Sequence, residues 1–278
     1  MKRILHDQQN VYIQGERLRG VQSCQAGWVN DESYVNAIGY EGGYIGSVTN
    51  GPMTGEFSVN RLMVSHHDPL IDLFESEDLS GEISYKDQDF SFNGGYINSY
   101  SCSCAVGEIP SLNFGITAYK NTGGSVASLG KGAETDDAFV VATPGSIILN
   151  VNGYTTNAIQ SFDFSITINR QPFQLIGDMQ PVHFLIEYPI EINCEFVMTV
   201  SDYQARNLFD SICSPEAQDL NFIFRDCDSN QEIRKFIVPD AKIVEYNQNS
   251  EVNQSLEATL TYKALCTNIN KIKNILNP

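Results

Sequence analysis

Long apolar runs and clusters of basic residues are both missing from this sequence. Nowhere do about 18 apolar residues follow one another, so no membrane span is expected. The chain has no cluster of five or more Lys and Arg, and its 17 basic residues face 34 acidic ones, giving a formal net charge of −17. Tight binding of nucleic acid depends on Lys and Arg that neutralise phosphates. The composition therefore argues against a membrane protein and against a protein that holds DNA or RNA tightly.

Residues able to support catalysis or metal binding are few. Of the four histidines, His66 and His67 are adjacent, so on a strand they point to opposite faces and cannot readily share an ion with Asp68. Residues 226–230 begin like a calcium loop but lack its glycine and glutamate, and residues 124–131 miss the spacing of a phosphate loop. The sequence therefore predicts no catalytic residue, no metal and no cofactor.

The seven cysteines are an odd number without repeated spacing. Cys102 and Cys104 lie two residues apart in an alternating stretch, which places both thiols on one face of a strand. Their spacing does not match common zinc-binding pairs. We expect reduced, buried thiols that pack as small apolar groups.

Apolar residues alternate with polar ones over much of the chain, which is typical of half-buried strands. The clearest stretches are Phe162 to Ile168, Phe114 to Ala118 and Leu256 to Tyr262, with shorter ones at Ile83–Tyr85, Phe90–Phe92 and Phe222–Phe224 beside turn residues such as Asn93-Gly94-Gly95. Helix signals occur at residues 68–77, where Pro69 suits a first helical position, and at residues 201–213. The pattern predicts a mainly β chain.

The sequence also repeats itself. Val21-Gln22-Ser23 recurs as Ile159-Gln160-Ser161, and Ile38-Gly39 recurs as Ile176-Gly177, both at an offset of 138. Further matches join Glu56-Phe57 to Glu195-Phe196, Ser111-Leu112 to Ser255-Leu256 and Tyr119-Lys120 to Tyr262-Lys263. We therefore expect two antiparallel β-sandwich or partial-barrel domains, each with one short flanking α-helix: residues 1–120 and 146–278, the second with a short C-terminal tail, joined by a Gly- and Ser-rich linker at 121–145.

A Gly-rich stretch at residues 40–52 has two interpretations. It is either an ordinary loop or an extended hairpin that leaves its domain and contacts a neighbour. Its counterpart at residues 178–189 is apolar, which implies a partner. On the second interpretation the contact residues between subunits or rings are Tyr40, Tyr44, Ile45, Val182, Phe184, Leu185 and Ile186.

Three stretches of the first half resemble phage tail tube proteins and the related rings of baseplate hubs. They are Gly20-Val21-Gln22-Ser23, Asn36-Ala37-Ile38-Gly39 before the hairpin, and Asn98 to Ser101 with Val106-Gly107-Glu108-Ile109-Pro110. The resemblance implies a structural, non-enzymatic virion protein whose two tail-tube-like domains assemble into stacked rings. Such rings commonly hold six domains, so we expect a trimer with pseudo-sixfold symmetry; a hexamer with one domain inside and the other outside is the competing arrangement.

The resemblance further implies a place in the virion tail after synthesis in the bacterial cytoplasm. Other tail proteins, namely the sheath, the hub and the terminator, would be partners, and DNA would pass through the lumen without specific binding during ejection. An acidic lumen would repel that DNA. A baseplate hub or tail-tip ring, a carbohydrate- or receptor-binding β-sandwich and, more remotely, a hydrolase with a concave site stay open as alternatives.

Overall fold

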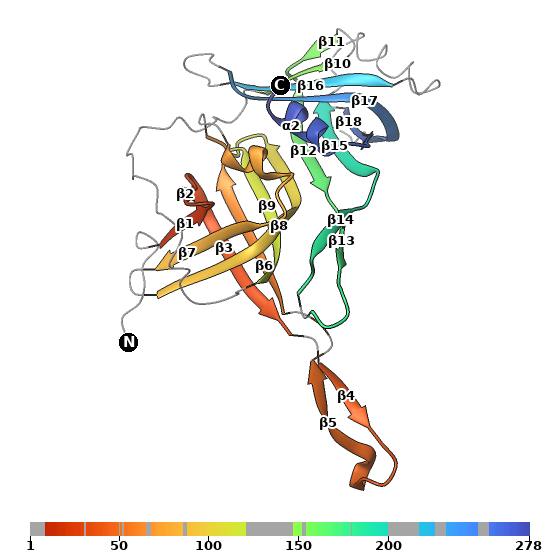
Figure 1. Ribbon diagram of the computed structural model, residues 1–278. Coiled ribbons are helices and arrows are strands. Elements are labelled where there is room, and N and C mark those ends of the chain that lie inside the picture. The colour runs from red at the N-terminus through yellow and green to blue at the C-terminus, as the bar shows by residue number, and fades with distance from the viewer. Residues whose placement is uncertain are drawn as a thin grey trace.

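The protein was analysed as a computed structural model (Figure 1). The structure describes most of the chain, and the statements below concern that part only: residues 9–30, 32–49, 51, 53–64, 68–85, 88–120, 147–151, 154–178, 180–199, 217–225, 232–249 and 256–278. Strands dominate the described residues, so the mainly β prediction is confirmed. The expected linker and the expected helix at 201–213 lie outside them.

Among the described residues, nine strands lie in each half of the chain. Those of the first half are β1 (Gln9–Ile13), β2 (Glu16–Arg17), β3 (Val21–Val29), β4 (Glu32–Asn36), β5 (Tyr44–Thr49), β6 (Thr54–Leu62), β7 (Leu79–Tyr85), β8 (Gln88–Ala105) and β9 (Ser111–Lys120). Those of the second half are β10 (Ile147–Val151), β11 (Tyr154–Thr156), β12 (Ile159–Thr167), β13 (Arg170–Phe173), β14 (His183–Ile186), β15 (Ile190–Thr199), β16 (Gln218–Arg225), β17 (Glu232–Asn249) and β18 (Glu257–Cys266).

Every strand pairing of the first half has a counterpart in the second. β3 pairs with β6, β6 with β9, β9 with β8, β8 with β7 and β7 with β1, all antiparallel. In the same order, β12 pairs with β15, β15 with β18, β18 with β17, β17 with β16 and β16 with β10. The small pairs β1–β2 and β4–β5 correspond to β10–β11 and β13–β14. The two halves therefore share one strand order.

The irregularities of the ladders give the residue correspondence between the halves. The register shifts at Val21 in β3 and at Ile159 in β12, an offset of 159 − 21 = 138. It shifts at Ile97 in β8 and at Ile243 in β17, an offset of 243 − 97 = 146. Bulges of this kind are positional features of a ladder, so they align the halves more securely than single residue matches.

This correspondence corrects three of the matches expected from sequence. Phe57 pairs with Ile116, and in the second half Cys194 pairs with Tyr262, so Phe57 corresponds to Cys194 and not to Phe196. The expected matches for Ser111-Leu112 and Tyr119-Lys120 are likewise out of register. A shift of two residues keeps every side chain on the same sheet face, which is why the first two errors could not be detected from alternation.

The halves are joined into one sheet by their own strands. Ser99–Ala105 of β8 pairs with Ser161–Thr167 of β12, and this pairing is named the internal seam below. The principal sheet therefore has the order β3-β6-β9-β8-β12-β15-β18-β17, four strands from each half. The two halves lie side by side in Figure 1, and the long strands β8 and β17 continue into a second layer that holds β7 with β1 and β16 with β10.

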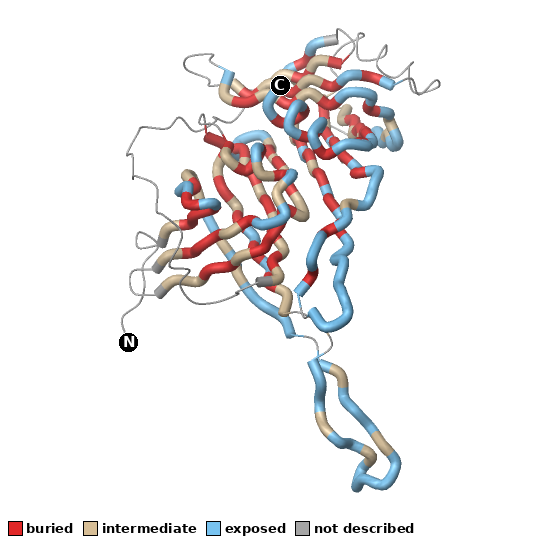
Figure 2. The backbone as a smooth tube through the Cα atoms, in the orientation of Figure 1, coloured by how far each residue is buried: buried red, intermediate tan, exposed pale blue. Residues whose placement is uncertain are grey.

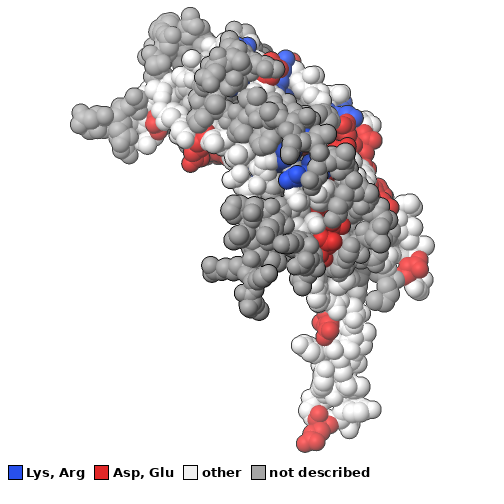
Figure 3. Space-filling view, turned by 90° about the vertical axis from the view of Figure 1, so that its left-hand side faces the viewer, with Lys and Arg blue, Asp and Glu red and all other residues white. Residues whose placement is uncertain are grey.

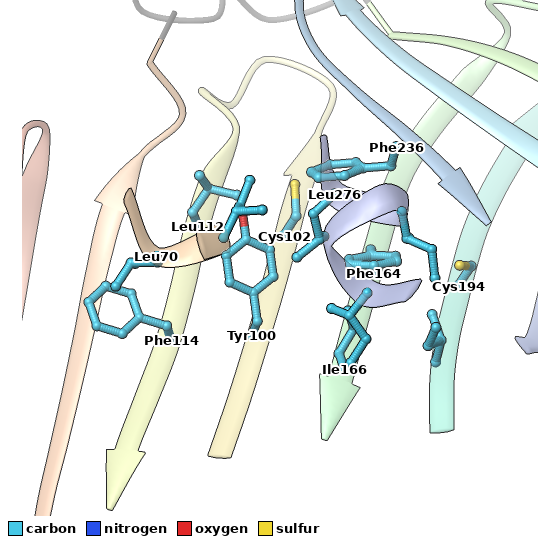
Figure 4. Close-up of a cluster of buried hydrophobic side chains, with 14 of the residues drawn as sticks. Leu70, Tyr100, Cys102, Leu112, Phe114, Phe164, Ile166, Cys194, Phe236 and Leu276 are labelled. Carbon is cyan, nitrogen blue, oxygen red and sulfur yellow. The ribbon is translucent and has the colours of Figure 1, made fainter. Parts of the chain in front are cut away.

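Apolar side chains from both halves form one buried cluster between these layers (Figure 2). The alternating stretch Phe162, Phe164, Ile166 and Ile168 is buried as predicted, as are Phe114, Ile116, Phe222 and Phe224. Figure 4 shows the cluster at the internal seam, where Tyr100 and Cys102 of β8 lie beside Phe164 and Ile166 of β12. The core is therefore continuous across the seam.

The stretch Asn93-Gly94-Gly95 is not a turn, as the sequence suggested, but lies inside β8. Gly94 has φ 62°, and the register between β7 and β8 shifts here. A Cβ at Gly95 would lie 3.0 Å from atoms of both Ile116 and Phe92. The glycines therefore let β8 bend while core side chains pack against its backbone.

The helical elements are short. The expected helix at 68–77 is present as the shorter 3₁₀ helix η3 (Pro69–Leu73), which has Pro69 at its start and is capped by Asp68, whose Oδ1 accepts from the Leu70 N–H at 3.1 Å. The predicted C-terminal tail instead forms the α-helix α2 (Asn270–Leu276). Leu276 of α2 lies at the seam cluster in Figure 4, and Lys273 forms an ion pair with Asp72 of η3. The C-terminal helix thus ties the two halves together.

A buried ionic group anchors η3 to the sheet. Asp68 is fully buried, forms an ion pair with Arg61 of β6 and accepts a hydrogen bond from the Tyr100 hydroxyl at 3.3 Å. Tyr100 also packs edge-on against Phe74, with ring centroids 5.7 Å apart. Asp68 is thereby engaged by Arg61 and Tyr100. The neighbouring histidines lie outside the described residues.

We predict that Asp68→Ala destabilises the protein by about 3–5 kcal/mol, because it leaves the Arg61 charge buried and uncompensated. Urea denaturation followed by circular dichroism measures this free energy of unfolding. The matched control is Glu191→Ala, which removes an exposed ion pair with Lys263 and should cost less than about 1 kcal/mol. Equal losses for the two variants would contradict the assignment.

Candidate assembly surfaces

Two strand edges of the principal sheet have no pairing strand among the described residues. One is the outer edge of β3, which pairs only with β6, and the other is the outer edge of β17 over residues 242–249, which pairs only with β18. Unpaired strand edges expose rows of N–H and C=O groups and invite pairing with another chain. The two edges are the counterparts of the two strands that meet at the internal seam, since β3 corresponds to β12 and β17 to β8.

The seam shows which backbone groups each edge presents. Val106 donates its N–H to the Gln160 carbonyl oxygen at 2.8 Å, and Ile168 donates to the Asn98 carbonyl oxygen at 2.8 Å. Hydrogen-bonded pairs recur every second residue in an antiparallel ladder. The even-numbered residues of both seam strands therefore direct their N–H and C=O groups across the seam and form its hydrogen-bonded pairs. By the offsets of 138 and 146, the even-numbered residues of β3 and of the end of β17 point their N–H groups outward.

Aromatic side chains mark both open edges on the face that continues the core. At the seam, Ile166 of β12 lies opposite Tyr100 of β8, and both are buried. Their counterparts are Trp28 of β3 (166 − 138) and Tyr246 of β17 (100 + 146). Trp28, the only tryptophan of the chain, is 56% exposed. Of the pair that is buried at the seam, the counterpart Trp28 is exposed and the counterpart Tyr246 is only partly buried against the core.

The β4–β5 hairpin projects away from the body of the molecule (Figures 1 and 2). Its tip is the 3₁₀ turn η2 (Glu41–Gly43), and the rings of Tyr34 and Tyr44 contact each other at 5.9 Å. Within its residues 32–49 the only charged side chains are Glu32 and Glu41, and Figure 3 shows a projection that is mostly uncharged. Residues 44–49 form a strand, so the hairpin interpretation holds for the geometry of this stretch.

The equivalent β13–β14 hairpin lies against the first half instead. Phe184 is only 6% exposed and packs on the rings of Tyr96 and Tyr119, with centroid distances of 4.9 and 5.0 Å. Arg170 at the base of the hairpin stacks 4.9 Å from the Tyr96 ring centre and donates to the Phe74 carbonyl oxygen at 2.6 Å. Burial lowers the pKa of Arg170. The second-half hairpin is thus fixed across the internal seam.

The seven residues expected at subunit contacts differ in how far they are exposed. Tyr40, Tyr44 and Ile45 on the first hairpin are exposed, and so are Val182 and Leu185 on the second. Ile186 is partly buried against the core. Phe184 is a correction: its ring is buried within the chain, on the first half, because the hairpin that carries it folds back over Tyr96 and Tyr119.

The face of the principal sheet opposite the core is mostly polar, with a few apolar side chains such as Val197 and Leu265 on it. Its side chains are mainly hydroxyls and amides, with six acidic and two basic groups among them: Glu56, Asp163, Glu191, Glu195, Glu245, Glu257, Lys242 and Lys263. Asp163 and Glu195 lie directly opposite each other on neighbouring strands. Burial raises the pKa of Asp163. The described part of this face is therefore net negative.

Hydrogen bonds between side chains order this polar face. The Asn60 amide donates to Asn113 at 2.6 Å, and Asn98 donates to the Thr117 hydroxyl at 2.8 Å. Ser103 and Ser111 share a hydrogen bond of 3.0 Å. Side chains that are hydrogen-bonded to one another have fewer donors free for another molecule. This arrangement is less suited to specific binding than a face with unpaired donors.

No set of three or more His, Cys, Asp or Glu side chains in the described part of the chain is placed to hold a metal ion. Within the same residues, no helix is long and apolar enough to cross a membrane. Cys102, Cys104 and Cys194 are unpaired and buried, and burial raises the pKa of each thiol, to about 11 for Cys104. The calcium-like and phosphate-like stretches lie outside the described residues.

Several residues at these surfaces were missed by sequence reasoning. Trp28 and Tyr246 lie on strands whose outer neighbours cannot be identified from alternation. The sequence around Arg170 is like that of an ordinary surface segment, so it gives no sign of a contact. The one available signal was the internal repeat: aligned correctly, it places Tyr246 over Tyr100 and Trp28 over Ile166, two residues of an apolar pattern.

The fold and its surfaces define a mainly β protein whose principal sheet has two open strand edges among the described residues. The family model for phage tail tube protein matches residues 20–264, and the chain belongs to that family. Among solved structures, the chain is similar to Hcp1 from Flavobacterium johnsoniae, with 17% identity over 43% of this chain and 93% of that one and a TM-score of 0.29. No curated protein matches.

We predict that Phe184→Ala lowers the free energy of unfolding of the isolated chain by about 3 kcal/mol or more, because it leaves a cavity on the Tyr96 and Tyr119 rings. The control on the same strand is Leu185→Ala, since Leu185 is 58% exposed and its loss should cost less than about 0.5 kcal/mol. Chemical denaturation at low protein concentration measures both. An unchanged stability of Phe184→Ala would show that the ring does not fix the hairpin within the chain.

Proposed function

We propose that three copies of this chain close into the ring of a phage tail tube, with six repeats around a channel for DNA. The observation that carries the proposal is the internal seam, in which β8 of one repeat pairs with β12 of the next. The two outer strands of the principal sheet are the counterparts of these seam strands: β17, which corresponds to β8, lies at one edge, and β3, which corresponds to β12, lies at the other. Repeating the seam between chains therefore satisfies every open edge of the principal sheet.

The seam also fixes the register of the proposed contact. Residues paired at the seam have numbers that total 266, as in Phe164 with Cys102. Shifting by 138 and 146 predicts that residues of β3 and of the neighbour's β17 pair with numbers that total 274. Trp28 then lies opposite Tyr246, and Ala26 lies opposite Gln248. Such a contact is heterologous, since different surfaces of the two chains meet, and it closes only as a ring.

The arrangement of the halves favours a trimer over a hexamer with one half inside and the other outside. Both halves supply four neighbouring strands to one sheet, and their polar faces are continuous. Three chains with eight such strands each make 24 strands. Spaced about 4.8 Å apart and tilted by about 40°, these enclose a barrel about 45–50 Å across. That width accommodates a DNA duplex once side chains line the wall.

The polar face would then line the channel, because the opposite face is occupied by the core. Its net negative charge repels the phosphate backbone, and its hydroxyls and amides are engaged with one another. The wall would thus let DNA pass during ejection without holding it. The exposed tips of the β4–β5 hairpins would contact an adjoining ring or another tail protein, with Tyr40, Tyr44 and Ile45 as contact residues.

We predict that Ala26→Pro abolishes trimer formation without unfolding the chain. The Ala26 N–H points outward from β3, so proline removes a donor that only the neighbour would use and is tolerated on an edge strand. Gln248→Pro should do the same on the β17 edge. Mass photometry and circular dichroism measure assembly and folding. Ala26→Val and Gln248→Val, which keep the N–H, are the matched controls.

Mixing the two proline variants tests the heterologous geometry. Each variant keeps one intact edge, so the mixture should form a one-to-one dimer with blocked ends and no larger species. A two-fold contact between two β3 edges would leave Gln248→Pro fully assembled, and this outcome, or assembly of Ala26→Pro, would exclude the proposed ring.

We predict that rings carrying Glu56→Lys, Asp163→Lys and Glu195→Lys retain duplex DNA, whereas unaltered rings do not. Each chain loses three negative and gains three positive charges on the proposed wall, and the retention should fall steeply with salt as phosphate contacts are lost. Electrophoretic mobility shift at low ionic strength measures it. The neutral control is Glu56→Gln, Asp163→Asn and Glu195→Gln. Lysine-bearing virions that eject DNA normally would contradict an acidic, repelling lumen.

A further inference from the structure

The surface that receives the second-half hairpin has a counterpart on the second half itself. Tyr96 and Tyr119, which hold Phe184, correspond through the offset of 146 to Lys242 and Leu265. Tyr96 lies opposite Thr117, just as Lys242 lies opposite Lys263. Yet the second-half site is open: Lys242 is exposed and Leu265 is 63% exposed. An equivalent docking surface is present without an occupant from the described chain.

The first-half hairpin carries the complementary group. Arg170 begins β13 and stacks on Tyr96, and its counterpart at the start of β4 is Glu32 (170 − 138). The contact between Arg170 and Tyr96 is therefore replaced by Glu32 and Lys242, which are oppositely charged. Phe184, which packs on Tyr96 and Tyr119, corresponds to Ser47. The apolar contact between Phe184 and Tyr96 is thus replaced by polar groups on both partners, and the charged pair is the contact that is left.

We propose that the base of the β4–β5 hairpin docks on the β17–β18 end of the neighbouring chain in the ring, with Glu32 paired to the neighbour's Lys242. The inference rests on the proposed trimer and adds to it a second, side-chain contact beside the strand pairing. The occupant must be a second copy, because the hairpin of the same chain projects from the opposite end of the sheet (Figure 1).

The charges around Lys242 favour it as the partner of Glu32 in this contact. Its cross-strand neighbour Lys263 already pairs with Glu191, with Nζ and Oε2 3.4 Å apart. No ion pair between described residues involves Lys242 or Glu32. A carboxylate that approaches here meets two lysines and one glutamate, so the local field favours it.

A charge-swap cycle tests the contact in the full-length protein. Glu32→Lys and Lys242→Glu should each weaken trimer association by about three- to tenfold per interface, since each places like charges together. The double variant, Glu32→Lys with Lys242→Glu, should recover most of the loss. Sedimentation equilibrium measures the association constant. Glu41→Lys, the same charge change at the hairpin tip, should leave ring formation unchanged and should not be rescued by Lys242→Glu.

Carbodiimide coupling gives a second readout that needs no substitution. It should join peptides that contain Glu32 and Lys242 in the trimer fraction and not in the monomeric Ala26→Pro variant. If the unaltered protein forms trimers but neither single substitution changes their association, the hairpin contact is wrong while the ring stands. If the unaltered protein stays monomeric at all concentrations, the ring and the contact fall together.

Discussion

Every strand edge in this protein leaves backbone N–H and C=O groups that need partners, and the rest of the structure follows from how they are satisfied. Within the chain the answer is the internal seam, where β8 and β12 pair main chain to main chain. The seam places both halves in one sheet, with most apolar side chains on one face and mainly polar side chains on the other. Among the described residues it also leaves one open edge at each end, and in the proposed ring the same kind of pairing would join one chain to the next.

Alternation along the chain was sufficient to predict the β class and the buried face of the strands, because side-chain period depends only on local backbone geometry. Phe162, Phe164 and Ile166 illustrate this. What alternation could not supply was register and partnership. A two-residue slip preserves the face, so the match of Glu56-Phe57 to Glu195-Phe196 looked sound. The pairing of β8 with β12 joins strands that are distant along the chain, and the glycines at 94 and 95 suit a bend inside a strand as well as a turn.

The candidate surfaces were predicted only in part for a similar reason. The first hairpin projects, as in one of the two interpretations of its sequence, since a Gly-rich stretch between strands has little with which to fold back. The second was expected to behave alike because it is apolar, but apolar residues such as Phe184 are drawn to the nearest apolar surface, which the first half provides through Tyr96 and Tyr119. Whether an apolar hairpin contacts its own chain or a neighbour depends on what lies beside it, and the sequence does not contain that geometry. The helix α2 was missed because its seven residues are too short for a clear period.

Several positions at the open edges carry smaller or more polar side chains than their counterparts at the seam, although Trp28 replaces Ile166 and Tyr246 replaces Tyr100. Phe162, Phe164 and Cys102 at the seam are replaced by Cys24, Ala26 and Gln248 at the edges, and the stacked Arg170 is replaced by Glu32. The seam is buried within one chain, so it can be as apolar as the rest of the core. In the proposed ring, the open edges would have to stay soluble until another chain arrives, because an apolar edge would aggregate first. Smaller and more polar groups would weaken each contact between chains, but closure of the proposed ring would make the last contact intramolecular and strengthen the whole assembly. The difference between the two halves would then separate a permanent contact from a reversible one within a single strand order.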